Sequence, residues 1–239
     1  MFMAYNTYMY LQAHPFEPLV YTKADKFTLS LISDGAHMKN VDVSVRGQLG
    51  WFLVLGNCTI MIESKAAARP TRSATETEIQ AGGNGLSQLT YIRLMLTALN
   101  VHVEGVHFYT DSLSGIKLIN RRQQLSKKAR HFANDIAQFK FAVDGEMQLQ
   151  LFFTPTDSMS ADLLTKLQIL GAKKKKFAAE ILNPSLFFQH SHQHINTTNN
   201  LFKKVRFCNA STTGLLDIPL DPDITYDDDP YYINEIYNQ

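Results

Sequence analysis

Four acidic residues occupy positions where side chains from separate elements can meet. Asp34 follows a strand predicted over 27–33, and Asp111 follows a strand predicted over 103–109. Glu78 lies near the start of a predicted helix, and Asp162 lies near the start of the last predicted helix. If the two strands are neighbours, their carboxyl ends bring Asp34 and Asp111 together, and the other two acids can complete the group. The spacing therefore predicts a carboxylate cluster.

A cluster of this kind has a defined chemistry. Mg²⁺ and similar hard cations prefer oxygen ligands, and carboxylates are the usual protein donors. Two such ions about 4 Å apart can activate water and stabilise the leaving oxygen in phosphodiester hydrolysis. Four acids in one cleft repel one another unless cations occupy it. The alternative reading is that acids at strand ends and helix starts only cap those elements or face solvent.

The elements that must position these acids can be read from apolar periodicity and turn residues. Strands are predicted over 27–33, 50–55, 59–64, 103–109 and 147–153. Helices are predicted from Ser73 or Thr75 through Leu99, and over 112–121, 128–143 and 160–170. Gly82, Gly83 and Gly85 are poor helix formers inside the first helix. The order βββαβααβα predicts an α/β fold with a mixed five-stranded sheet flanked by helices.

Composition and charge restrict the class of protein. The 239 residues are 45% apolar and 19% charged, as in an ordinary globular protein. Two cysteines, Cys58 and Cys208, are too few for a disulfide framework. Because no apolar run is long enough to cross a membrane and the N-terminus lacks signal-peptide features, we expect an intracellular, soluble protein with no membrane partner. Residues 1–206 hold all 23 basic but only 15 of the 22 acidic side chains, a net charge of +8 that favours a polyanionic partner.

Seven short motifs occur in order along the chain. They are Tyr10 to Tyr21, Ser33-Asp34-Gly35-Ala36-His37, Gly50 to Phe52, Ser64-Lys65, Ser73 to Ala81, Tyr109-Thr110-Asp111-Ser112 and Phe153 to Lys166. From about residue 8 to 170 they resemble the reverse transcriptase connection and ribonuclease H region of copia-type (Pseudoviridae) LTR retrotransposon Pol polyproteins. The last motif, which ends Ser160-Ala-Asp-Leu-Leu-Thr-Lys166, is the most specific.

The resemblance implies a domain organisation and a set of site residues. It implies a remnant of the reverse transcriptase connection over 1–24, an RNase H-like domain over 25–172, and a basic then acidic, partly disordered tail over 173–239. By motif position the active-site acids are Asp34, Glu78, Asp111 and Asp162. Glu76 competes with Glu78 for the helix position. Glu78 is preferred because it directly precedes Ile79-Gln80-Ala81.

The activity that the resemblance implies is two-metal hydrolysis of the RNA strand of RNA–DNA hybrids during reverse transcription. The metal would be Mg²⁺, with Mn²⁺ as the alternative. Asp34 would bridge two ions, Glu78 and Asp111 would hold one near the leaving oxygen, and Asp162 would hold the ion that activates water. The implied partners are the hybrid and the reverse transcriptase portion of the same polyprotein, in cytoplasmic virus-like particles or in the nucleus.

Two alternatives stay open at this point. The chain could be a catalytically inactive RNase H-fold remnant that serves as a nucleic-acid-binding or structural module. It could also be another metal nuclease of the same fold that acts on DNA, as an integrase does, although the order of the four acids argues against this. Both alternatives keep the fold and the basic surface.

Some residues depart from the motifs or lie beside them. His37 stands where the family has Trp, Gly35 and Gln80 are unusual, and no histidine occurs over 154–160. Basic residues that flank a predicted helix near the Asp111 motif are predicted to contact the substrate backbone: Arg121, Arg122, Lys127, Lys128 and Arg130. The run Lys173 to Lys176 is either a phosphate contact or a solvated helix end. His190, His192 and His194 are interpreted as a solvated loop rather than a metal site.

Overall fold

A computed structural model of the chain describes residues 19–21, 23–24, 26–37, 46–120, 132–166, 169 and 171–189. Several predictions fall on other residues and lie outside the described ones. These are residues 1–18 of the connection remnant proposed over 1–24, the five basic residues between 121 and 130, and the histidines and acidic tail beyond 189.

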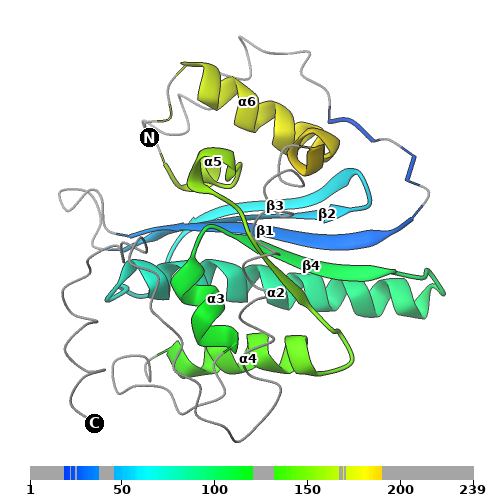
Figure 1. Cartoon of the computed structure of the whole chain (residues 1–239), viewed down its shortest axis with the longest axis horizontal. Helices are drawn as coiled ribbons and strands as arrows, with labels where there is room; N and C mark the ends of the chain where they lie inside the picture. The colour runs from blue at the N-terminus through cyan, green and yellow to red at the C-terminus, as the bar shows by residue number, and fades with distance from the viewer. Residues whose placement is uncertain are drawn as a thin grey trace, which may run out of the picture. The chain divides into compact units, whose positions relative to one another are not determined.

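A five-stranded sheet forms the centre of the domain (Figure 1). Its strands are β1 (Thr28–Ala36), β2 (Gln48–Leu55), β3 (Cys58–Ala66), β4 (Gly105–Thr110) and β5 (Gln150–Phe153), arranged in the order β3-β2-β1-β4-β5. The pairs β1–β2 and β2–β3 are antiparallel, whereas β1–β4 and β4–β5 are parallel. The predicted α/β fold with a mixed five-stranded sheet is confirmed. This strand order and these directions are those of the RNase H-like fold.

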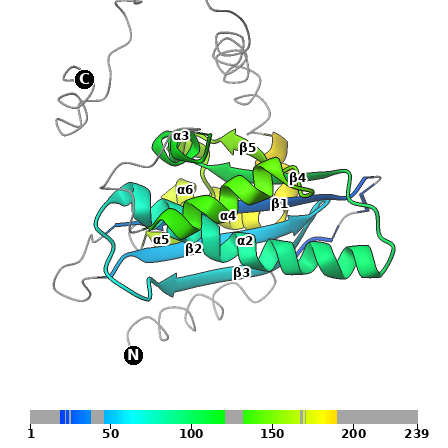
Figure 2. The same cartoon turned by 90° about the horizontal axis from the view of Figure 1, so that it is seen from below.

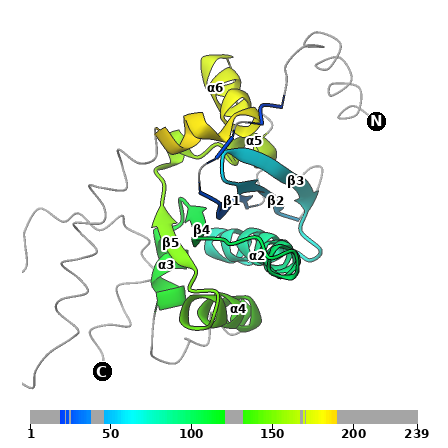
Figure 3. The same cartoon turned by 90° about the vertical axis from the view of Figure 1, so that its right-hand side faces the viewer.

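Helices cover both faces of the sheet. The helices α2 (Ala74–Ala98), α3 (Leu113–Asn120) and α4 (Ala133–Asp144) lie on one face, below the sheet in Figure 1 and nearest the viewer in Figure 2. The helices α5 (Asp162–Thr165) and α6 (Gly171–Leu182) lie on the other face, as the end-on view of Figure 3 shows. A hydrophobic core lies on each face of the sheet, and alternate residues of β1 and β2 belong to one or the other because successive strand side chains point to opposite faces. Leu31 and Trp51 pack on the side of α2, and Ile32 and Phe52 pack on the side of α6.

The glycines of α2 do not interrupt the helix, which runs unbroken for 25 residues. A Cβ added at Gly85 would lie 2.4 Å from Leu31 Cδ1, and one added at Gly82 would lie 2.8 Å from the Phe108 ring. Both distances are far below van der Waals contact. These two glycines therefore let the helix lie against the sheet more closely than any larger residue would allow.

Several predicted boundaries differ from the structure by a few residues. The strand predicted over 27–33 runs to Ala36, so Asp34 lies inside β1 and not after it. Two further differences have a local cause. The predicted helix from Ser160 through Leu170 is wrong, since α5 is one turn that ends at Thr165, where Lys166 adopts extended backbone angles (φ −112°, ψ 110°). The final strand begins at Gln150 rather than Met147, because the chain is still turning at Gln148, whose φ is 48°. Both differences arise from local backbone geometry that apolar periodicity does not report.

The packed body continues beyond residue 172, where the sequence analysis placed the end of the domain. Helix α6 buries Phe177 and Ile181, and a further helical segment over 184–189 buries Phe187. The Phe187 ring meets the Phe52 ring edge to face at 6.3 Å. The sheet face above β1 and β2 is thus covered by residues that the sequence analysis assigned to the tail.

Candidate metal centre

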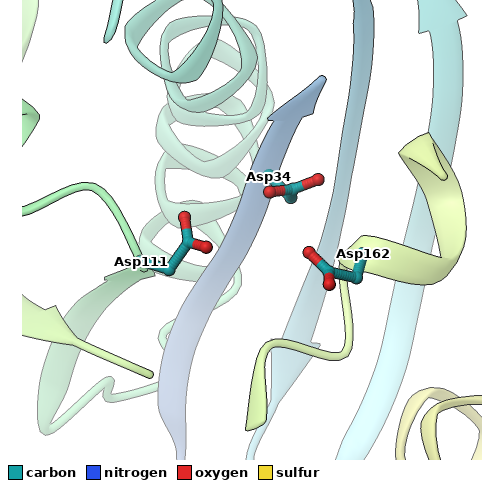
Figure 4. A group of neighbouring side chains, drawn as sticks. All are labelled: Asp34, Asp111 and Asp162. Atoms are coloured by element: carbon teal, nitrogen blue, oxygen red, sulfur yellow. The ribbon is translucent and has the colours of Figure 1, made fainter. Parts of the chain in front are cut away.

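Three of the four predicted acids converge at one edge of the sheet. Asp34 lies in β1, and Asp111 directly follows β4, which is parallel to β1 and pairs with it at Ile32 and Tyr109. Asp162 opens α5 above the same edge. One carboxylate oxygen of each residue lies within 4.8 Å of the others, and Figure 4 shows the three side chains pointing toward one another.

Glu78 lies beside this group, on the second turn of α2, without belonging to the set of three mutually close oxygens. Its carboxylate accepts a hydrogen bond from the Gly35 backbone N–H at 3.1 Å. Burial raises the pKa of Glu78 well above its usual value, and the nearby Asp34 and Asp111 carboxylates raise that pKa further. The helix acid therefore shares the electrostatic environment of the three aspartates.

Gly35, unusual for the motif, has a structural reason to be glycine. A Cβ added there would lie 2.6 Å from the carbonyl carbon of Thr77 and 2.7 Å from the Glu78 nitrogen. Those atoms are backbone and cannot move aside as a flexible side chain would. Only glycine lets β1 approach the first turns of α2 closely enough for the Gly35 N–H to reach Glu78.

Glu76, the competing acid, has a different task. The Glu76 N–H donates to the hydroxyl of the N-cap residue Ser73 at 3.1 Å, and its carboxylate accepts from the Arg72 N–H at 2.7 Å. Together these bonds satisfy two N–H groups at the start of α2, as a capping box does, but the carboxylate bonds the residue before the N-cap instead of the N-cap itself. Arg69 pairs with the same buried carboxylate at 3.7 Å. Glu76 thus stabilises the start of α2, while the catalytic role of Glu78 stays a prediction.

Burial and mutual repulsion make full ionisation of the cluster costly. Burial is the largest cause that raises the pKa of Asp34, of Asp111 and of Asp162. Repulsion adds to it, because Asp162 raises the pKa of Asp34, and Asp34 raises that of Asp111. A buried group of acids with raised pKa values is stabilised by any cation that enters it.

Three further residues hold the carboxylates and were not predicted as site residues. Thr165 Oγ1 donates to Asp34 Oδ2, and Thr156 Oγ1 donates to Asp111 Oδ2 at 2.8 Å. Lys166 Nζ donates to Asp162 Oδ1 and lies 3.9 Å from Asp34 Oδ1. A signal was available for Lys166 alone, because it lies four residues after Asp162, a spacing at which helical side chains meet.

Other residues singled out in the sequence have ordinary structural roles. His37 Nδ1 is 2.9 Å from Thr71 Oγ1, near the start of α2. Ser112 Oγ accepts from the Gly115 N–H at 3.1 Å, which caps the start of α3. Lys173 pairs with exposed Asp157 at 3.2 Å, and Lys176 pairs with buried Glu180 at 3.7 Å.

The donor set fits a hard divalent cation. Three carboxylate oxygens within 4.8 Å of one another, with a fourth carboxylate beside them, match the ligands that Mg²⁺ and Mn²⁺ prefer. The ammonium of Lys166 already lies against two of these carboxylates, which shows that the cluster accommodates positive charge. Asp34, Asp111 and Asp162 are therefore the residues that could hold a metal ion, with Glu78 adjacent.

Strand order and site together define a class, an RNase H-like α/β domain with a carboxylate cluster at the carboxyl edge of β1 and β4. No protein-family model matches the chain, and no curated protein matches it. Among the helices that the structure describes, none has the length and apolar character needed to span a membrane.

Several solved RNase H structures resemble the chain in fold. An RNase H1 isolated from compost by a metagenomic approach is 16% identical over 58% of this chain and 92% of its own, with a TM-score of 0.43. The N-terminal RNase H domain of a Mycobacterium tuberculosis protein is 13% identical over 64% of this chain and 97% of its own, also with a TM-score of 0.43. The RNase H domain of prototype foamy virus is 13% identical over 70% and 96%, with a TM-score of 0.36.

Proposed function

We propose that this chain is a divalent-metal-dependent ribonuclease H that hydrolyses the RNA strand of RNA–DNA hybrids. The observation that carries the proposal is the convergence of Asp34, Asp111 and Asp162 at one edge of an RNase H-like sheet. Glu78 lies against the same group through the Gly35 N–H. The ordered motifs around these acids, which resemble those of copia-type elements, support RNA–DNA hybrid as the substrate and a retrotransposon polyprotein as the source.

The proposed chemistry places Asp34 at the centre of the metal site. Divalent ions, Mg²⁺ or Mn²⁺, would supply charge stabilisation at the scissile phosphate and a more acidic bound water. Asp34 is the proposed ligand shared by two metal ions, because its carboxylate interacts with the carboxylates of both Asp162 and Glu78. Thr165 and Thr156 orient Asp34 and Asp111 through their hydroxyl groups, which fixes the direction of one carboxylate oxygen in each residue.

Five basic residues are proposed to bind the nucleic acid: Arg121, Arg122, Lys127, Lys128 and Arg130. Their place between α3 and α4 in the chain, after the Asp111 motif, supports contact with the sugar–phosphate backbone of the hybrid. Each phosphate contact of this kind releases counterions, so hybrid binding should weaken as salt rises. The reverse transcriptase portion of the same polyprotein is the proposed protein partner, and cytoplasmic virus-like particles or the nucleus the proposed location.

One observation favours a second candidate function. The Lys166 ammonium lies against Asp162 and Asp34 and offsets part of their negative charge. A permanent ammonium at this place would suit a non-catalytic RNase H-fold module that binds nucleic acid or serves a structural role. The two candidates differ in turnover and in metal binding, and both properties can be measured.

A cleavage assay tests the proposal. The purified chain is incubated with Mg²⁺ or Mn²⁺ and a hybrid whose RNA strand is labelled, beside the same sequence as duplex DNA and as duplex RNA. Cleavage of the RNA strand of the hybrid alone, lost in Asp111→Asn and on removal of metal with a chelator, is the expected result.

The controls separate the alternatives. Lys26→Met lies two residues before the start of β1, at the opposite end of that strand from Asp34; it removes one charge away from the site and should cleave normally. Hybrid binding without cleavage would identify the non-catalytic module. Cleavage of duplex DNA in preference to the hybrid would contradict the assignment of substrate.

A further inference from the structure

The end of α5 sends a lysine into the acid cluster. Asp162 opens this one-turn helix, and Lys166 closes it, with the Lys166 N–H bonded to the Asp162 carbonyl at 2.9 Å. Residues four apart on a helix lie on the same side, so the Lys166 side chain turns back over Asp162. The backbone becomes extended at Lys166, so α5 ends there, with the Lys166 ammonium beside Asp34 and Asp162.

The ammonium occupies the place where the carboxylates of separate elements meet. Lys166 Nζ is bonded to Asp162 Oδ1 and lies 3.9 Å from Asp34 Oδ1, and these two acids belong to α5 and β1. Its positive charge also acts on Glu78 and Asp111. An ordinary surface pair on a helix joins one lysine to one acid, whereas here one lysine lies against two carboxylates from different elements.

A divalent ion at the same carboxylates competes with this ammonium. An ion held by Asp34 and Asp162 would approach the carboxylates that now face Lys166 Nζ, and two positive charges at such a separation repel each other. The Lys166 side chain is 23% exposed, so its head has a route to solvent. Its unbranched stem with several rotatable bonds lets the ammonium swing away while the backbone stays in place.

We propose that Lys166 is a resident counter-cation of the site, which holds the carboxylates together in the metal-free protein and leaves Asp34 and Asp162 when a divalent ion binds. This inference rests on the proposed function, because it takes the carboxylate cluster to be the metal site. It assigns Lys166 a positioning role: the residue sets how tightly the site binds metal and protects the cluster from its own repulsion. It also gives the ammonium a role compatible with turnover, in place of a permanent block.

The test measures metal binding and stability without nucleic acid. Lys166→Met removes the charge and keeps the length of the side chain, and Lys26→Met is the matched control at a distant ion pair. Titration calorimetry with Mn²⁺ gives the dissociation constant, and thermal denaturation with and without Mn²⁺ gives the stability of each state. Asp111→Asn marks binding that belongs to the cluster.

The expected result has two parts with opposite signs. Without metal, Lys166→Met should melt below the wild type, because the carboxylates lose their counter-charge. With Mn²⁺, the variant should bind about tenfold more tightly or better, since no ammonium has to be displaced. Lys26→Met should change neither quantity. Should Lys166→Met fail to fold without metal, Lys166→Gln keeps a hydrogen-bond donor for Asp162 and carries the same expectation.

The outcomes separate this inference from the proposed function. Mn²⁺ binding by the wild type with unchanged or weaker binding by both Lys166 variants would overturn the inference and leave the metal site standing. If Lys166→Met binds Mn²⁺ and the wild type does not, the ammonium blocks the site permanently. That result would overturn both its displacement by metal and the proposed catalysis. Failure of the wild type and of both Lys166 variants to bind Mn²⁺ would overturn the inference and the proposed function together.

Discussion

The α2 glycines provide a quantitative test of how closely this helix lies against the sheet. Gly83→Ala and Gly85→Ala make the same chemical change on the same helix, two residues apart. A Cβ at Gly83 meets nothing nearer than Asp135 Oδ1 at 3.6 Å, which is ordinary contact. A Cβ at Gly85 would lie 2.4 Å from Leu31 Cδ1 and 3.2 Å from Trp51 Cγ. The first substitution tests helix propensity alone, and the second adds an overpacked contact.

The magnitudes follow from these distances. Replacing glycine by alanine inside a helix stabilises it by about 0.5–1 kcal/mol, which is the whole effect expected at Gly83. At Gly85 the extra methyl is more than 1 Å too close to a fully buried leucine on the central strand, and overpacking of this kind costs about 1–3 kcal/mol. Because the gain in helix propensity is common to both variants, their free energies of unfolding should differ by the overpacking cost, about 1–3 kcal/mol, with Gly85→Ala the less stable.

Urea denaturation followed by circular dichroism measures this difference directly. An equal m-value in both variants shows that the change lies in stability rather than in the extent of unfolding. If Gly85→Ala proves as stable as Gly83→Ala, α2 does not lie as close to β1 as the structure places it. The approach of α2 to Gly35 and the position of Glu78 would then also need revision.

Three further predictions concern the site and the boundary of the domain. Glu78→Gln should lower hybrid cleavage at least about tenfold, whereas Glu76→Gln should keep cleavage and lower only the melting temperature; equal losses of cleavage would contradict the assignment. Because the folded pKa of Asp111 is raised, the metal-free folded protein binds more protons there than the unfolded chain, and stability falls as pH rises from about 4 through the folded pKa. Asp111→Asn should therefore be more stable than the wild type at neutral pH without metal and equal to it in acid, as pH-dependent urea titrations can show; Mg²⁺ should favour the wild type. Phe187→Ala should lower the free energy of unfolding by about 3–5 kcal/mol, since the ring is 1% exposed, and a loss below about 1 kcal/mol would place 184–189 outside the folded body.

The fold was predictable because its signals are local. The strand that carries Asp34 and the strand that ends before Asp111 follow from short apolar runs, although β1 continues two residues past Asp34. The order of strands and helices then restricts the sheet to few arrangements. Ser73 as the N-cap of α2 was one of two candidates, and its bond from the Glu76 N–H decides between them. Each of these features depends on residues within a few positions of one another.

The supporting contacts of the site were not predictable, because they join distant parts of the chain. Thr165 bonds to Asp34 across 131 residues, and the clash that requires Gly35 to be glycine is with the backbone of Thr77. Neither contact leaves a periodic signal. The lysine-rich start of α6 and the irregular sequence after it suggested a solvated tail, yet Phe177 and Phe187 are buried, because the sheet face above β1 and β2 needs a cover that composition does not reveal.

Direct location of a bound metal ion tests the central claim most simply. Crystals of the chain soaked with Mn²⁺ and measured at the manganese absorption edge should show an anomalous peak between Asp34, Asp111 and Asp162. The Lys166 ammonium should then have moved away from Asp162. A map with no peak at these carboxylates, and with Lys166 still bonded to Asp162 at saturating Mn²⁺, would contradict the assignment of this cluster as a metal centre.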